Sequence, residues 1–211
     1  QKYKEAIPYL TAYSGKRGKW SNTDYYQLGY AYYKQNDFEK AISEFNKIIS
    51  GNDSVAQNAY YHLAESYVNL NKKQEALNAF RNASQMDYDL KIQEDAWLNY
   101  AKLSYEIGNP YQSVPQVLTS YLNKYPQTSN KSEVETLLID SYITSKNYKE
   151  ALRLLEGKNS FENKVAYQKV AFYRGIEVYN EGDYREAKTL FEKSLKEQRD
   201  ANFTARATFW K

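Results

Sequence analysis

Residues 22–53 read NTDYYQLGYAYYKQNDFEKAISEFNKIISGND, and residues 57–88 follow the same pattern 35 positions later. In the first stretch Leu28, Gly29 and Tyr32 precede a polar break, and Ala41 and Phe45 follow it. The counterparts in the second stretch are Leu63, Ala64, Tyr67, Ala76 and Phe80. Apolar residues three and four positions apart form one stripe on a helix. Each stretch therefore predicts two amphipathic helices separated by a short turn.

The second helix of this unit recurs along the whole chain. A small residue, or valine, is followed four positions later by a large apolar residue, at steps of 35, 35, 38, 37 and 36 positions. The six pairs are Ala6/Leu10, Ala41/Phe45, Ala76/Phe80, Val114/Leu118, Ala151/Leu155 and Ala187/Phe191. Small side chains allow two helices to approach closely, and large ones then fill the space beside the crossing. The third unit departs from the pattern, because Val114 replaces alanine and Lys102 stands where the first helix should carry a small residue.

These units resemble the tetratricopeptide repeat, a helix–turn–helix motif of about 34 residues. The resemblance covers nearly the whole chain and implies an all-α fold, a right-handed superhelical solenoid of antiparallel helix hairpins. One hairpin cannot bury its apolar faces alone, so stability comes from stacking on neighbours. We expect a single array over residues 1–211, with a half-repeat at 1–18, repeats at about 22–55, 57–90, 95–128, 132–164 and 168–200, and the start of a further repeat at 201–211. The two incomplete repeats predict a fragment of a longer protein.

Composition limits the partners. The chain has 29 Lys and Arg against 26 Asp and Glu, a net charge of +3, with no basic run. A nucleic-acid partner is therefore not expected. No window approaches the ~18 consecutive apolar residues of a membrane span. Cysteine is absent, which removes disulfides, thiolate nucleophiles and cysteine metal sites.

Residues for catalysis are scarce in this sequence. The single histidine, His62, has no second histidine or cysteine to join it. No glycine-rich phosphate loop, no Gly-x-Ser-x-Gly turn and no zinc-ligand spacing occurs. The acidic pairs Glu94/Asp95 and Glu133/Glu135 are explained by helix first turns. We therefore predict a protein that is not an enzyme, with no cofactor and no metal.

The resemblance also implies a binding surface, because the first helices of tetratricopeptide repeats line a concave groove where partners lie. A protein or peptide partner is expected there. The residues that it would contact are Tyr26, Tyr30, Tyr33, Lys34, Asn58, Tyr61, Glu65, Asn99, Leu103, Glu106, Thr136, Asp140, Ile143, Phe172, Ile176 and Tyr179.

The tyrosines Tyr26, Tyr30 and Tyr33 share one helix face. An exposed aromatic platform is a common centre of binding energy. The alternative is that these rings pack against the preceding helix at residues 2–13. A clamp for chaperone tails is not expected, because the places of its lysine, asparagine and arginine residues are taken by Tyr26, Tyr30, His62, Ala96 and Tyr100.

The sequence thus predicts a protein-interaction scaffold or assembly module. Two alternatives are the sensor or regulatory arm of a larger signalling protein, and a carbohydrate-handling envelope protein whose tyrosines stack on sugars. The segment Tyr121–Ser129 is similar to a helix-end motif of bacterial envelope tetratricopeptide proteins. This similarity favours the bacterial cell envelope, or periplasm, with the cytoplasm as the alternative. Phe209 and Trp210 in the last helix offer a further possible contact surface.

Overall fold

The computed structural model describes residues 2–211, and over that range it contains twelve α-helices and no strand. The predicted all-α fold is confirmed. The helices are α1 (Lys2–Ala12), α2 (Asn22–Lys34), α3 (Phe38–Phe45), α4 (Ser54–Asn69), α5 (Lys73–Gln85), α6 (Leu90–Ile107), α7 (Val114–Lys124), α8 (Lys131–Thr144), α9 (Tyr148–Leu155), α10 (Phe161–Asn180), α11 (Tyr184–Glu197) and α12 (Ala201–Trp210). They fall into two compact units. Unit 1 ends at Pro126 and holds α1 to α7, and unit 2 begins at Gln127 and holds α8 to α12.

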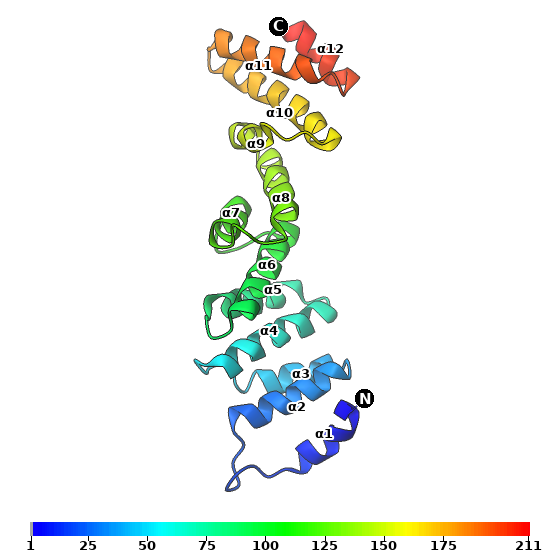
Figure 1. Cartoon of the computed structure of the whole chain (residues 1–211), viewed down its shortest axis with the longest axis vertical. Helices are drawn as coiled ribbons and strands as arrows, with labels where there is room; N and C mark the ends of the chain where they lie inside the picture. The colour runs from blue at the N-terminus through cyan, green and yellow to red at the C-terminus, as the bar shows by residue number, and fades with distance from the viewer. Residues whose placement is uncertain (1) are drawn as a thin grey trace. The chain divides into compact units, whose positions relative to one another are not determined.

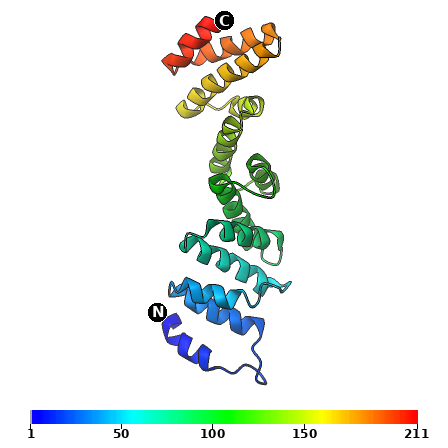
Figure 2. The ribbon, with the colours of Figure 1, turned by 180° about the vertical axis from the view of Figure 1, so that it is seen from behind.

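Within each unit the helices form stacked antiparallel hairpins. In unit 1, α2 pairs with α3 and α4 pairs with α5, and α3 packs on α4 while α5 packs on α6 (Figures 1 and 2). Helix α1 covers the free side of α2. In unit 2, α10 pairs with α11, and α12 packs against both of them. Each hairpin thus buries the face that its neighbour leaves open.

Four hairpin turns share one three-residue design, seen clearly at Gln35–Asp37. Asn36 has a left-handed backbone with φ of 60°. The Asp37 N–H donates to the Tyr32 carbonyl at 3.0 Å, and the Asn36 N–H donates to the Tyr33 carbonyl at 3.0 Å. These two bonds form a Schellman cap. The Asp37 carboxylate then accepts the Lys40 N–H and starts α3. The left-handed residues of the other three turns are Asn71, Lys146 and Gly182.

The small residues lie at the helix crossings, as the repeat pattern predicts. Ala41, Ala76, Ala151 and Ala187 are all buried. Gly29 shows how close the approach is, because a Cβ built there would lie 2.8 Å from Cε1 of Phe45. The aromatic ring of the second helix therefore occupies the space that a larger residue of the first helix would need.

The third hairpin corrects the sequence analysis in two places. Its turn runs from Gly108 to Ser113, three residues longer than the others. The second helix is displaced by the same three residues, so Val117 and Tyr121, both fully buried, take the places expected for Val114 and Leu118. In α6 the small buried residue at the crossing is Ala101, and not Lys102.

A side chain of the longer turn holds it in place. The Asn109 amide donates to the Tyr100 hydroxyl and to Ser104 Oγ, both at 2.8 Å. The side-chain oxygen Oδ1 of Asn109 accepts hydrogen bonds from the N–H groups of Tyr111 and Gln112. Asn109 thus satisfies the backbone of the turn while linking it to α6.

Buried glutamines connect one hairpin to the next. Gln57 Nε2 donates to the Met86 carbonyl at 2.7 Å and to the Asp89 carbonyl at 3.1 Å. Gln57 Oε1 accepts the Asp89 N–H at 2.7 Å. In unit 2, Gln168 makes the same kind of contacts with Asp200. Each glutamine therefore fixes the segment where the following first helix begins.

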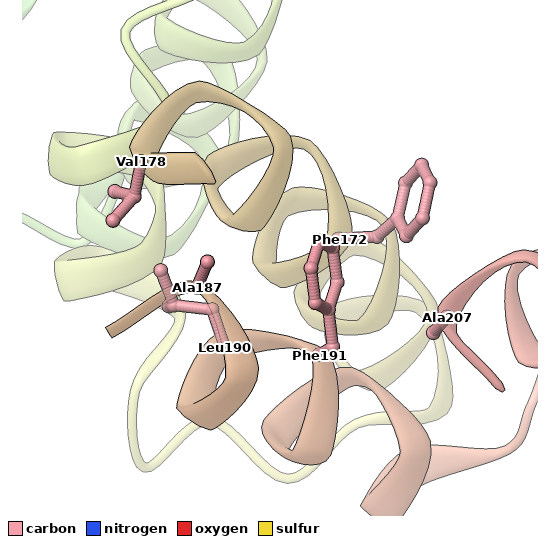
Figure 3. Close-up of a cluster of buried hydrophobic side chains, with 6 residues drawn as sticks. All are labelled: Phe172, Val178, Ala187, Leu190, Phe191 and Ala207. Atoms are coloured by element: carbon pink, nitrogen blue, oxygen red, sulfur yellow. The ribbon is translucent and has the colours of Figure 1, made fainter. Parts of the chain in front are cut away.

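The core of unit 2 centres on two phenylalanines (Figure 3). Phe191 extends from α11 against α10, and Phe172 on α10 lies 5.8 Å from it between ring centroids. Ala207 of α12 closes the cluster on the side of Phe172. At the end of the same helix Phe209 is 83% exposed and Trp210 is partly exposed.

Candidate functional site

The candidate site lies on the first-helix face of unit 1, the surface formed by the adjacent helices α2, α4 and α6. Helix α2 packs on α4, and α4 packs on α6. Helix α2 starts at a capping box, in which Ser21 and Asp24 exchange hydrogen bonds with each other's backbone N–H groups. Asp53 and Asp89 cap α4 and α6. These caps fix where each helix begins, and hence which residues share the face.

Four tyrosines surround the single histidine and form what we call the tyrosine cluster. The centroids of the Tyr30 and Tyr33 rings lie 5.0 Å from that of His62. Tyr61 lies at 5.4 Å and Tyr26 at 6.1 Å. The rings of α2 are therefore tied to the following first helix, α4. Tyr30 also contacts Tyr3 of α1 at 5.6 Å, so the packing expected against the preceding helix exists as well.

The cluster has a charged edge. His62 Nδ1 lies 2.8 Å from the Glu65 carboxylate. Burial and the nearby Glu65 charge raise the pKa of the Tyr33 hydroxyl to about 12. The Lys34 ammonium lies over the rings of Tyr30 and Tyr33, 5.1 and 5.3 Å from their centroids. Such cation–π contacts contribute about 0.5–1 kcal/mol at exposed sites.

A polar link joins α4 to α6 beside the cluster. The Tyr61 hydroxyl donates to the Asp95 carboxylate. Asn99 Nδ2 donates to the Asp95 carbonyl at 2.9 Å and to its carboxylate at 3.3 Å. Burial, followed by this hydrogen bond to Asp95, raises the pKa of Tyr61.

Next to this link the surface is hollowed into what we call the Glu65 pocket. It has a volume of about 160 Å³ and is lined by Glu65, Val68, Asn69, Phe80 and Asn99. Phe80 is buried and forms an apolar floor, whereas Val68 is exposed at the rim. The pocket combines a carboxylate, two amides and an apolar base, which suits the binding of one polar side chain.

The structure brings together most of the predicted contact residues of unit 1. Seven of them form the tyrosine cluster, its charged edge and the pocket: Tyr26, Tyr30, Tyr33, Lys34, Tyr61, Glu65 and Asn99. Asn58 lies on α4 and bonds the Ser54 carbonyl of its own helix. Glu106 forms an ion pair with Lys73.

Leu103 is wrong as a predicted contact residue, because it is only 8% exposed. The reason is the corrected register of α6. With Ala101 instead of Lys102 at the crossing, the exposed face rotates by one residue, about 100°. That rotation turns Leu103 into the core.

In unit 2 one predicted contact residue is wrong, and the others are spread over two helices, α8 and α10. Phe172 has no exposed surface, because Phe203 and Arg206 of α12 cover it. Ile176 packs against the unit 2 core, and Tyr179 is partly exposed beside Tyr184 and Trp210. Asp140, Thr136 and the partly buried Ile143 lie on α8.

Sequence reasoning missed three residues of the site. Asp95 was explained as part of an acidic first turn, and Val68 and Asn69 were not considered. A signal for Asp95 exists, since it lies 34 positions after Tyr61, close to one repeat length along the chain. Likewise Val68 and Asn69 follow Tyr33 and Lys34 by 35 positions.

Comparison with known proteins agrees with this architecture. The family described as "Anaphase-promoting complex, cyclosome, subunit 3" matches residues 1–83. The C-terminal part of a TPR repeat-containing protein from Cytophaga hutchinsonii superposes with a TM-score of 0.53. That match has 15% identity and covers 92% of this chain and 74% of the other. This chain has the tetratricopeptide-repeat fold.

Two further tetratricopeptide-repeat structures are similar at lower scores. YrrB, a TPR protein with an unusual peptide-binding site, is 17% identical, with a TM-score of 0.49 and coverage of 99% of this chain and 98% of that one. A tetratricopeptide repeat protein from Parabacteroides merdae is 18% identical, with a TM-score of 0.43 and coverage of 99% and 77%. No curated protein matches the sequence. Over residues 2–211, no helix has the length and apolar character needed to cross a bilayer.

Proposed function

We propose that the first-helix face of unit 1 binds a polypeptide segment of a partner protein, so that the chain acts as an interaction scaffold. The observation that carries the proposal is the Glu65 pocket, placed directly beside the tyrosine cluster. A peptide crossing α2, α4 and α6 meets aromatic surface and hydrogen-bonding groups in succession. This combination is typical of protein-binding surfaces, in which a few aromatic anchors supply most of the energy.

The asparagines favour a ligand with a polypeptide backbone. Asn58, Asn69 and Asn99 each donate Nδ2 to the carbonyl four residues earlier on their own helix, at 2.8 to 2.9 Å. Each side chain is therefore held in one orientation, with its amide oxygen able to accept a further hydrogen bond. Backbone N–H groups and donor side chains of a peptide supply such bonds.

A sugar-binding role for the tyrosine cluster is less well supported. Stacking on a sugar needs an open ring face, but Tyr30 is stacked between Tyr26 and Tyr33 at centroid distances of 5.9 and 6.0 Å. Lys34 lies over the same rings. The cluster therefore supports the neighbouring pocket better than it offers a flat platform.

A selection with random peptides displayed on phage tests the proposal. The full chain is immobilised, and selected peptides are synthesised and measured by fluorescence anisotropy. We expect Tyr61→Ala to weaken their binding roughly tenfold or more, because the variant removes one ring of the tyrosine cluster and the hydrogen bond that holds Asp95. Tyr9→Ala serves as the matched control, since Tyr9 is 79% exposed on α1 and distant in sequence from the site.

The experiment has three outcomes. Selective loss in Tyr61→Ala, with circular dichroism and melting close to the parent chain, supports binding at this face. Equal binding by the parent chain, Tyr61→Ala and Tyr9→Ala would place the peptides elsewhere and reject the proposal. Failure to select any peptide above background would reject it too.

A further inference from the structure

The Glu65 pocket presents hydrogen-bond acceptors to a ligand. Asn69 Nδ2 donates to the Glu65 carbonyl at 2.8 Å, and Asn99 Nδ2 donates to Asp95. Because a carbonyl can only accept, these bonds fix which amide atom is the nitrogen. The remaining oxygens of both asparagines are acceptors. Together with the Glu65 carboxylate they give the pocket three accepting groups.

The carboxylates beside the pocket take part in hydrogen bonds. Glu65 is bonded to His62, and Asp95 accepts from Tyr61 and Asn99. Both carboxylates thus place negative charge beside the pocket, and such charge attracts a cation.

The floor of the pocket adds a requirement for apolar contact. Phe80 lies below and Val68 at the rim, so a bound side chain needs an aliphatic stem as well as a donor-rich head. Lysine and arginine have this combination of stem and charged head. A carboxylate ligand would face Glu65, and a purely apolar one would leave the acceptors without partners.

We propose that the Glu65 pocket takes a lysine or arginine side chain of a partner polypeptide, with the stem against Phe80 and Val68 and the charged head on Glu65. The inference rests on the proposed peptide-binding function and assigns it a sequence preference. The amide oxygens of Asn69 and Asn99 complete the set of acceptors. The adjacent Asp95 adds negative charge that favours a basic segment over an acidic one.

A positional library tests this preference. Acetylated peptide amides carry Arg, Lys, citrulline, Gln or Glu at one position in turn and mixed residues elsewhere, and anisotropy reports binding to the full chain. We expect Arg or Lys to bind at least about tenfold tighter than citrulline or Gln at one position, since a charged hydrogen bond contributes about 1.5–3 kcal/mol. Glu65→Gln should reduce that ratio to about threefold or less.

Two further variants sharpen the result. Glu75→Gln makes the same change of charge on the exposed first turn of α5 and should leave the ratio unchanged. Asn69→Asp adds a carboxylate at the pocket and should increase the ratio. Melting curves of all three variants identify any loss of fold, and Asn69→Asp tests the pocket even if Glu65→Gln is unstable.

The outcomes distinguish this inference from the proposed function. The inference is overturned if peptides bind without a preference for Arg or Lys. It is also overturned if that preference is the same in Glu65→Gln and Asn69→Asp as in the parent chain. Both outcomes leave the scaffold function intact. Absence of any peptide binding rejects both. Free agmatine, which carries a guanidinium without a peptide, should compete only at much higher concentration. Agmatine binding as tight as that of the best peptides would overturn the assignment to a polypeptide.

Discussion

Phe191 occupies the space that a side chain at Gly175 would need. A Cβ built on Gly175 would lie 2.7 Å from Cε1 of Phe191 and 2.9 Å from its Cδ1. The same relation joins Gly29 to Phe45 in unit 1. Two hairpins that are far apart in the sequence therefore use the same contact, in which a ring of the second helix covers bare backbone of the first.

Replacing Gly175 by alanine should destabilise unit 2, although alanine favours a helix by about 0.5–1 kcal/mol. The added methyl group must displace a fully buried ring, and overpacking of this kind costs about 1–3 kcal/mol. We expect a net loss of about 1 kcal/mol in the free energy of unfolding, measured by urea titration. Lys188→Ala, on the exposed side of α11, is the control and should change little. Higher stability in Gly175→Ala would contradict the close approach.

The sequence predicted the hairpins because their determinants are local. Small residues such as Ala41 and Ala76 must recur once per unit wherever two helices cross, and polar turns must separate the helices. The register of the second helix in the third hairpin could not be predicted in this way. Val114/Leu118 and Val117/Tyr121 fit a spacing of four equally well, and the length of the turn decides between them.

The candidate site was predicted in part for a related reason. The face carrying Tyr26, Tyr30 and Tyr33 follows from helical spacing alone. The burial of Phe172 does not, because Phe203 and Arg206, which cover it, belong to a helix that begins about thirty residues later. Contacts between repeats depend on how the hairpins stack, which spacing within one repeat does not determine.

Lys146 should be replaceable by glycine with a gain in stability. Its backbone is left-handed, with φ of 59°, and a residue with a Cβ is disfavoured there by about 1–2 kcal/mol. Lys146→Gly should therefore raise the free energy of unfolding by about 1 kcal/mol. Gly182→Lys is the matched reversal, because Gly182 holds the same place in the next turn and has open space around it. Shifts of the same sign in both variants would refute the argument.

Gln57 should contribute strongly to the stability of unit 1, because its buried amide links α4 to the start of α6. Gln57→Leu leaves the Asp89 N–H and the Met86 carbonyl without these partners. Each unsatisfied buried group costs about 1–3 kcal/mol, so a loss of about 2–4 kcal/mol is expected in urea titration. Gln74→Leu, exposed on α5, is the control. A loss no greater than that of the control would show that the link is unimportant.

Stability should fall as the pH rises from 10 to 12, partly because of Tyr33. In the folded chain the pKa of its hydroxyl is raised from 10.0 to about 12, chiefly by burial and then by Glu65. The unfolded chain therefore loses this proton first, so the stabilisation is complete below pH 10 and is lost as the pH approaches 12. Tyr125, whose pKa is also raised to about 12, contributes in the same direction. Urea titrations at pH 9, 10 and 11 should show a shallower decline for Tyr33→Phe than for the parent chain. Tyr9→Phe, changed at an exposed tyrosine, should follow the parent chain, and a Tyr33→Phe profile as steep as these two would exclude this role for Tyr33.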